Sequence, residues 1–130
     1  MQRFIAGLFL AICGCLHAQT IDLLASIPFS FHAGNAILPA GEYRVHHENH
    51  TLVIQERTGA HTALLLANDA YQPNLPSRST LTFNRYGENY FLSSLSVVGD
   101  AYGSALPKTR SEKELARGGD LGQSVSVALK

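Results

Sequence analysis

Short segments in which polar and apolar residues alternate constrain the fold of this chain more than any other feature. A period of two places one face of a segment in a core, as in a half-buried β-strand. Turn-forming Gly, Asn, Asp or Pro residues separate the segments, which cover residues 27–32, 41–47, 51–57, 61–67, 79–86, 89–98 and 123–129. About seven short strands of this kind predict an all-β fold, either an antiparallel β-sandwich or a small, partly open barrel.

Two tight turns set the expected strand pairing. With Asn49-His50 as a two-residue loop, residues 41–47 and 51–57 form a hairpin, and Gly87-Glu88 joins the next pair of strands in the same way. The first strand carries Pro28 near its start or on a sheet edge. The run Leu64-Leu65-Leu66 is typical of a buried strand.

One short helix is expected late in the chain, over residues 108–117. Ser111 and Glu114 have the spacing of a capping box at a helix start. Only Leu115 and Ala116 in this stretch can be buried against the strands, so we expect the helix to be peripheral and mostly solvated.

The N-terminus has the organisation of a secretory signal peptide. Arg3 precedes an uninterrupted apolar run over residues 4–12, which fits a signal peptide and is shorter than the ~20 residues that span a bilayer. Ala18 suits the position before a cleavage site, so we expect a signal peptide over 1–18 and a single β domain over 19–130, beginning at Gln19. The sequence therefore predicts a secreted or periplasmic protein.

A second interpretation of the same segment leads to a membrane anchor. Ile12-Cys13-Gly14-Cys15 resembles a bacterial lipobox, in which Cys15 would carry lipid and become the mature N-terminus. Such a lipoprotein would be held at a membrane, whereas a chain cleaved after Ala18 would diffuse freely.

Removal of the signal leaves a nearly neutral domain without cysteine. Cys13 and Cys15 are the only cysteines, and Arg3 is the only charged residue before position 19. The remaining 9 basic and 10 acidic side chains provide no excess of positive charge for nucleic acid or anionic lipid. Disulfides and thiol chemistry are excluded from the mature domain, and no later apolar run is long enough to span a membrane.

The histidines at positions 46, 47 and 50 resemble a metal site only superficially. A zinc-protease motif needs a second histidine four positions after the first, on a helix, but Thr51 stands four positions after His47 and the flanking residues indicate strands. On a strand, His47 points toward the core side and His46 toward the opposite face. We therefore expect no metal site and no cofactor.

An aromatic and basic cluster is the candidate for a binding surface. The Gly87-Glu88 turn brings Arg85, Tyr86, Tyr90 and Phe91 together, with Arg85 opposite Tyr90. Aromatic rings and an arginine could hold a carbohydrate or a peptide by stacking or cation–π contacts. The alternative is cross-strand packing that fixes the register of the hairpin.

No catalytic motif is recognised in the sequence. It contains no serine in a nucleophile-elbow context and no Gly-rich phosphate loop, so no catalytic residue is assigned. Glycosidase-like chemistry would require the fold to bring together two carboxylates such as Glu42, Glu56 or Glu88, and nothing in the sequence selects a pair.

Several segments of the chain are distinctive as a set: IPFSFHAGN at 27–35, LPAGEYRV at 38–45, FNRYG at 83–87 and LPKTRSEKELA at 106–116. Together they resemble a family of small, uncharacterised exported bacterial β proteins that are abundant in soil acidobacteria. The resemblance implies export and a single β domain, and it carries no activity, cofactor or site residue.

The sequence favours a non-enzymatic binding or structural module at the cell envelope, with an unknown protein or glycan partner. The alternative is a small extracytoplasmic hydrolase or carbohydrate-active enzyme with an unrecognised site. A deep polar pocket with converging Glu, Asp or His side chains would favour the enzyme. A flat aromatic patch around Tyr86, Tyr90 and Phe91 would favour the binding module.

Overall fold

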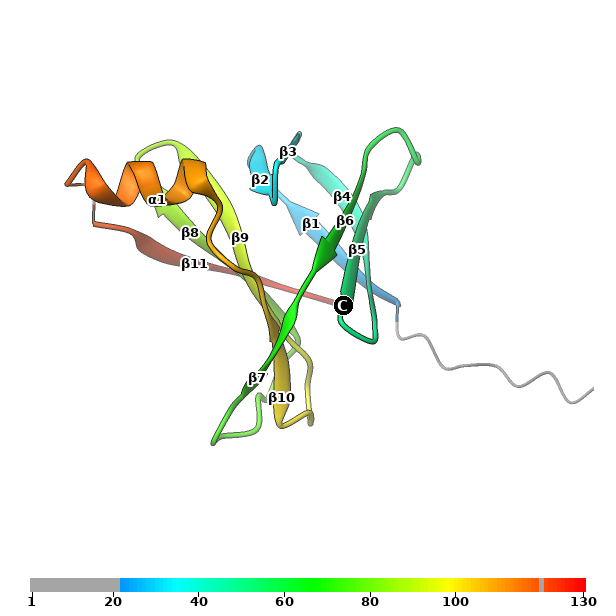
Figure 1. Ribbon diagram of the computed structural model, residues 1–130. Coiled ribbons are helices and arrows are strands. Elements are labelled where there is room, and N and C mark those ends of the chain that lie inside the picture. The colour runs from blue at the N-terminus through cyan, green and yellow to red at the C-terminus, as the bar shows by residue number, and fades with distance from the viewer. Residues whose placement is uncertain (1–21, 120) are drawn as a thin grey trace, which may run out of the picture.

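Two β-sheets packed against each other form the domain (Figure 1), and they confirm the predicted all-β fold, in its sandwich form, with one short helix near the C-terminus. The computed structural model describes residues 22–119 and 121–130. The predicted signal over 1–18, with Ala18, Gln19 and Cys15, lies outside these residues. In the described part of the chain, no helix is long and apolar enough to cross a membrane.

The first sheet has four antiparallel strands. In spatial order they are β1 (Asp22–Ile27), β4 (Gly41–Glu48), β5 (Thr51–Glu56) and β6 (Thr62–Leu66). β4 and β5 form the predicted hairpin, with Glu48 opposite Thr51 and the Asn49-His50 turn between them. Asn49 adopts a positive φ of 53°, which asparagine tolerates better than most residues. β6 forms one edge of this sheet.

The second sheet is larger and contains both strands of the second predicted hairpin, β8 and β9. Its main path runs through β11 (Gln123–Ala128), β8 (Thr80–Tyr86), β9 (Asn89–Ser96), β10 (Tyr102–Ala105) and β7 (Asn68–Tyr71). A short hairpin of β2 (Phe31–Ala33) and β3 (Ala36–Leu38) joins β9 through a parallel bridge between His32 and Phe91. The chain changes sheets between β6 and β7, at the buried Ala67.

Aromatic rings from both sheets meet in the core. The fully buried Phe31 ring packs edge-on against Tyr43 of β4 and Phe83 of β8, with ring centroids 5.3 and 5.4 Å apart. Such edge-to-face packing is a favoured geometry for aromatic side chains and adds to the free energy of burial. Phe31, the first residue of β2, therefore packs the second sheet against the first.

The predicted first strand is wrong in its extent. Residues 27–32 do not form one strand, because β1 ends at Ile27 and β2 begins at Phe31. Pro28 lies between them, where its missing N–H breaks no ladder. The separation allows β1 to pair in the first sheet while β2 pairs in the second.

The predicted burial of the three consecutive leucines is also wrong for two of them. Leu64 and Leu66 are 71% and 79% exposed, and only Leu65 is partly buried. Consecutive residues of a strand point to opposite faces, and the outer face of the first sheet is uncovered at β6. A continuous apolar run therefore indicates here an exposed apolar face rather than a doubly buried strand.

The helix, α1 (Arg110–Arg117), begins two residues later than predicted and has a different cap. Thr109 is the N-cap residue, and its hydroxyl accepts a hydrogen bond from the Glu112 backbone N–H at 3.3 Å. The predicted capping by Ser111 is therefore wrong by two residues. The residue that α1 buries is Glu112, whereas Leu115 is only partly buried and Ala116 is exposed.

Candidate functional site

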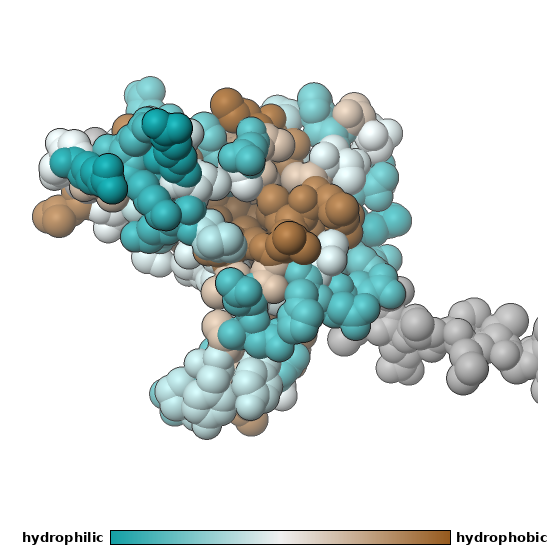
Figure 2. Space-filling view, in the orientation of Figure 1, coloured by the Kyte–Doolittle hydropathy of each residue, from teal (hydrophilic) through white to brown (hydrophobic). Residues whose placement is uncertain are grey.

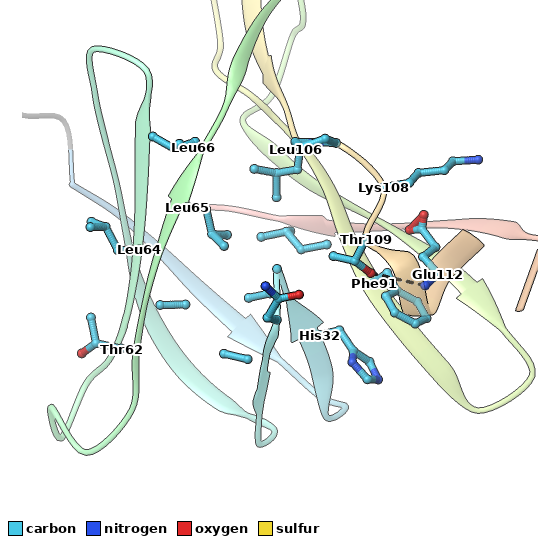
Figure 3. Close-up of a pocket in the computed structure, with 17 residues that line it drawn as sticks. His32, Thr62, Leu64, Leu65, Leu66, Phe91, Leu106, Lys108, Thr109 and Glu112 are labelled. Carbon is cyan, nitrogen blue, oxygen red and sulfur yellow. Dashed lines mark hydrogen bonds between the residues drawn. The ribbon is translucent and has the colours of Figure 1, made fainter. Parts of the chain in front are cut away.

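A groove of about 550 Å³ runs between the edge strand β6 and the segment that leads from β10 into α1. One wall is formed by residues 62–66, and the other wall by residues 106–109 together with Glu112. The β2–β3 turn, Phe91 and Leu92 line the space between them. Figure 3 shows Leu65 of β6 and Leu106 of the opposite segment facing the groove from its two sides.

The β6 wall is apolar and open to solvent. Figure 2 shows a hydrophobic surface at the centre of this face, where β6 runs in Figure 1. Leu64 and Leu66 of β6 are both exposed. Exposed apolar area of this kind, rimmed by polar residues, is typical of interaction sites.

Gly34 fixes how closely the β2–β3 turn approaches β6. Its φ is +59°, and a Cβ atom at this position would lie 2.6 Å from the Cδ2 atom of Leu65. Glycine provides both the left-handed conformation and the space that the Leu65 side chain occupies. The turn and β6 therefore form one continuous apolar surface at this end of the groove.

The wall across from β6 holds a buried carboxyl group. Glu112 is 3% exposed, and its Oε1 atom accepts a hydrogen bond from the Asn84 amide at 3.5 Å. Its Oε2 atom is buried and has no hydrogen-bond partner among the described residues. Burial raises the pKa of this carboxyl group, and the Asn84 hydrogen bond and the positive charge of Lys108 oppose that rise.

His32 adds an aromatic surface to the groove rather than a charge. Its ring stacks on Phe91 with centroids 4.3 Å apart and an angle of 14° between the planes. Burial lowers the pKa of His32, which favours the neutral imidazole. A neutral, stacked ring can contact an apolar ligand and still offer one hydrogen-bonding nitrogen.

The predicted aromatic patch is distributed over the interior and the surface. Tyr86 and Phe91 are buried, with rings 5.9 Å apart, whereas Arg85 is exposed and lies 5.4 Å from the partly buried Tyr90 ring. Tyr90 stacks on Phe29 at 3.8 Å. The cation–π contact of Arg85 and the stacking of Tyr90 are therefore made with other residues of the protein. Of the four predicted residues, Phe91 alone lines the groove, and ligand binding by the patch stays a prediction.

The three neighbouring histidines diverge, as their positions on β4 and its turn predict. His46 lies on the outer face, with Nδ1 3.0 Å from Asp22 and Nε2 3.4 Å from Glu48. His47 is partly buried, and His50 lies in the turn, 3.8 Å from Asp69. Within residues 22–119 and 121–130, no group of three or more His, Cys, Asp or Glu side chains is placed to hold a metal ion.

The three acidic residues considered for glycosidase chemistry have separate surroundings. Glu42 forms an ion pair with Arg57 at 2.8 Å. Glu56 lies 3.8 Å from His61, and Glu88 is exposed in the β8–β9 turn. None of the three lines the groove.

Sequence reasoning missed the two features that define the groove. The exposure of Leu64 and Leu66 depends on the outer face of the first sheet being uncovered at β6, which alternation within one segment does not show. The burial of Glu112 could have been suspected from its place three residues after Thr109, because that spacing allows a capping interaction at the first turn of a helix.

No family model, curated protein or solved structure matches this chain.

Proposed function

We propose that this chain is an exported, non-enzymatic binding module of the cell envelope, and that the groove beside β6 is its binding site. The observation that carries the proposal is the apolar strand β6: Leu65 faces a groove of about 550 Å³, and Leu64 and Leu66 are exposed on the opposite face of the same strand (Figure 3). Small-ligand and peptide sites are commonly concave, largely apolar and supplied with a few polar groups. The groove combines apolar side chains, such as Leu65 and Leu106, with polar ones, such as His32 and Thr109.

The polar groups of the groove support binding rather than catalysis. His32 is stacked on Phe91, the Thr109 hydroxyl caps α1, and Glu112 accepts from Asn84. No hydrogen bond joins the side chains of these three described residues to one another, whereas a nucleophile and its base require such a contact. The second candidate, a small extracytoplasmic hydrolase or carbohydrate-active enzyme, is favoured only by the presence of a buried carboxyl group in the groove.

Export is tested by mass spectrometry of the mature protein from its native host. We expect an N-terminus at Gln19, or its cyclised form, in the secreted or periplasmic fraction. A lipid-modified Cys15 would instead make the protein a membrane-anchored lipoprotein. A full-length chain in the cytoplasm would contradict export in either form.

Binding is tested by titrating the ¹⁵N-labelled domain 19–130 with soluble fragments of the host cell envelope. We expect amide shifts that concentrate at residues 62–66, 32–36 and 106–112. Shifts confined to Arg85 and Tyr90 would move the binding site to the predicted aromatic patch. An unchanged spectrum would contradict the binding function, and hydrolysis of the added fragments would favour the enzyme.

A further inference from the structure

We propose that the groove beside β6 takes an extended peptide segment by strand addition, so that the segment pairs with the free edge of β6 and places apolar side chains in the groove. The inference rests on the proposed function and specifies the class of partner. In this mode, backbone hydrogen bonds provide affinity and alternate side chains provide specificity.

The pairing of β5 with β6 determines which peptide groups of β6 face the open edge. The Ala67 backbone N–H donates to the His50 carbonyl oxygen, and the His61 carbonyl oxygen accepts from the Glu56 backbone N–H. In an antiparallel ladder these residues alternate with residues whose N–H and C=O point away. The outward groups therefore belong to Thr62, Leu64 and Leu66, and the sheet order ends at β6.

The edge of β6 lacks the features that usually prevent strand addition. Natural edge strands carry lysine, proline, inward-pointing charges or β-bulges that discourage pairing with another chain. The five residues of β6, TALLL, include no charge and no proline, and their register with β5 is continuous from Thr62 to Leu66. Three outward peptide units are thus available for a partner strand.

The opposite wall of the groove favours a single extended segment over the edge of a second copy. Residues 106–109 of the same chain bound the groove across from β6. A strand that pairs with β6 would have its other edge against residues 106–109. If that strand belonged to a sheet of a second copy, the next strand of that sheet would collide with these residues. The Leu106 N–H is already donated to Ser93, and Pro107 has no N–H. The far wall therefore offers apolar contact rather than a second ladder.

The distribution of charge specifies the chemistry of that segment. β6 and the β2–β3 turn bring no charged side chain to the groove, and the charged groups, Lys108 and Glu112, lie at the opposite wall. The Glu112 Oε2 atom is buried without a partner among the described residues, and an unpartnered buried acceptor is stabilised by a donor. An uncharged apolar strand with a lysine or arginine near one end complements both features.

The test uses a peptide that matches this description, acetyl-Lys-Thr-Val-Thr-Leu-Thr-Val-amide, titrated into the ¹⁵N-labelled domain 19–130. Two further peptides carry N-methyl groups either on the three threonines or on the two valines and the leucine. Alternate N–H groups of a strand point to opposite edges, so we expect one methylated peptide to lose binding and the other to retain it. Equal binding of all three would overturn strand addition.

A proline substitution tests the same inference from the protein side. Leu64→Pro removes an N–H that points to the open edge and leaves the β5–β6 hydrogen bonds in place, and proline is tolerated at such edge positions. We expect a folded protein whose peptide dissociation constant is at least about fivefold higher, the effect of one net hydrogen bond. The matched variant Leu64→Thr changes the side chain and keeps the N–H, and should bind more tightly than Leu64→Pro.

The two proposals can fail separately. If envelope fragments shift the groove amides and the unmethylated peptide does not, the binding function stands and strand addition is overturned. If both leave the groove amides unchanged, both proposals are wrong. If Leu64→Pro unfolds, the pair of methylated peptides still decides the inference on the unaltered domain. A concentration-dependent dimer that the peptide does not dissociate would assign the edge to a second copy instead.

Discussion

At the scale of single residues, the approach of Gly34 to Leu65 determines one end of the groove. Alanine at position 34 would combine a positive φ with a contact of 2.6 Å to the Leu65 side chain. We expect Gly34→Ala to destabilise the protein by about 2 kcal/mol or more, measured by urea unfolding. Gly87→Ala is the matched control, because Gly87 has a φ of +62° and no atom within 4 Å of the added Cβ. Equal losses in the two variants would contradict the packing role of Gly34.

The buried carboxyl group of Glu112 gives a prediction with a defined pH dependence. Burial raises its pKa in the folded protein, so the folded state holds this proton more tightly than the unfolded state. The contribution of this group to stability is present below the unfolded pKa and is lost as the pH rises through the folded pKa. Glu112→Gln should therefore gain stability relative to the wild type as the pH rises from about 4 to about 7.

Thermal or urea unfolding at the two pH values measures this difference. Glu114→Gln, an exposed position of the same helix, is the matched control for removing a carboxylate without burial. A stability difference between Glu112→Gln and the wild type that stays constant or shrinks as the pH rises would contradict the burial of a titrating carboxyl group.

At the scale of elements, the N-cap of α1 is Thr109 and not the predicted Ser111. Thr109→Ala should destabilise the domain by about 1 kcal/mol, because the Thr109 hydroxyl accepts from the first turn of the helix. Ser111→Ala should have a much smaller effect, since Ser111 is exposed within the helix. Denaturant unfolding of both variants checks this, and a larger loss for Ser111→Ala would restore the predicted cap.

The hairpins were predictable and the short strands were not. β4–β5 and β8–β9 each carry clear alternation and a two-residue turn, so local sequence determines their pairing. β3, β7 and β10 have only three or four residues each, too few for a period to be recognised. β10 also contains Gly103, where a Cβ atom would lie 2.9 Å from the Leu95 carbonyl oxygen, so packing rather than strand propensity selects its residues.

The candidate site depends on contacts that local sequence does not encode. Leu64 and Leu66 are exposed because nothing covers the outer face of β6, and β6 has a free edge because the chain crosses to the other sheet at Ala67. The sequence predicts that Phe91 belongs to an exposed stacking patch, but Phe91 is buried, lines the groove and stacks on His32. Both outcomes depend on tertiary pairing, which a single sequence without structural context leaves open.

At the scale of the whole molecule, the two edges of the first sheet differ, because the edge at β1 is paired and the edge at β6 is open. The opposite edge of the first sheet is covered, because Leu24 of β1 exchanges two backbone hydrogen bonds with Lys130 at the C-terminus. The Ala25–Leu129 bridge extends this closure. The outward peptide groups of β6 have no equivalent partner in the described part of the chain. In the first sheet, therefore, the edge at β6 is open and the edge at β1 is covered.

Amide hydrogen exchange along β6 is the most direct test of an open edge that pairs with a peptide strand. In the free domain, the N–H groups of Ala63, Leu65 and Ala67 should exchange slowly, because they point toward β5, and those of Thr62, Leu64 and Leu66 should exchange rapidly. Addition of the unmethylated peptide should slow exchange at Thr62, Leu64 and Leu66 and leave their neighbours unchanged. Uniform protection of β6 in the free domain, or no gain at these three amides with peptide bound, would contradict an open edge that binds a strand.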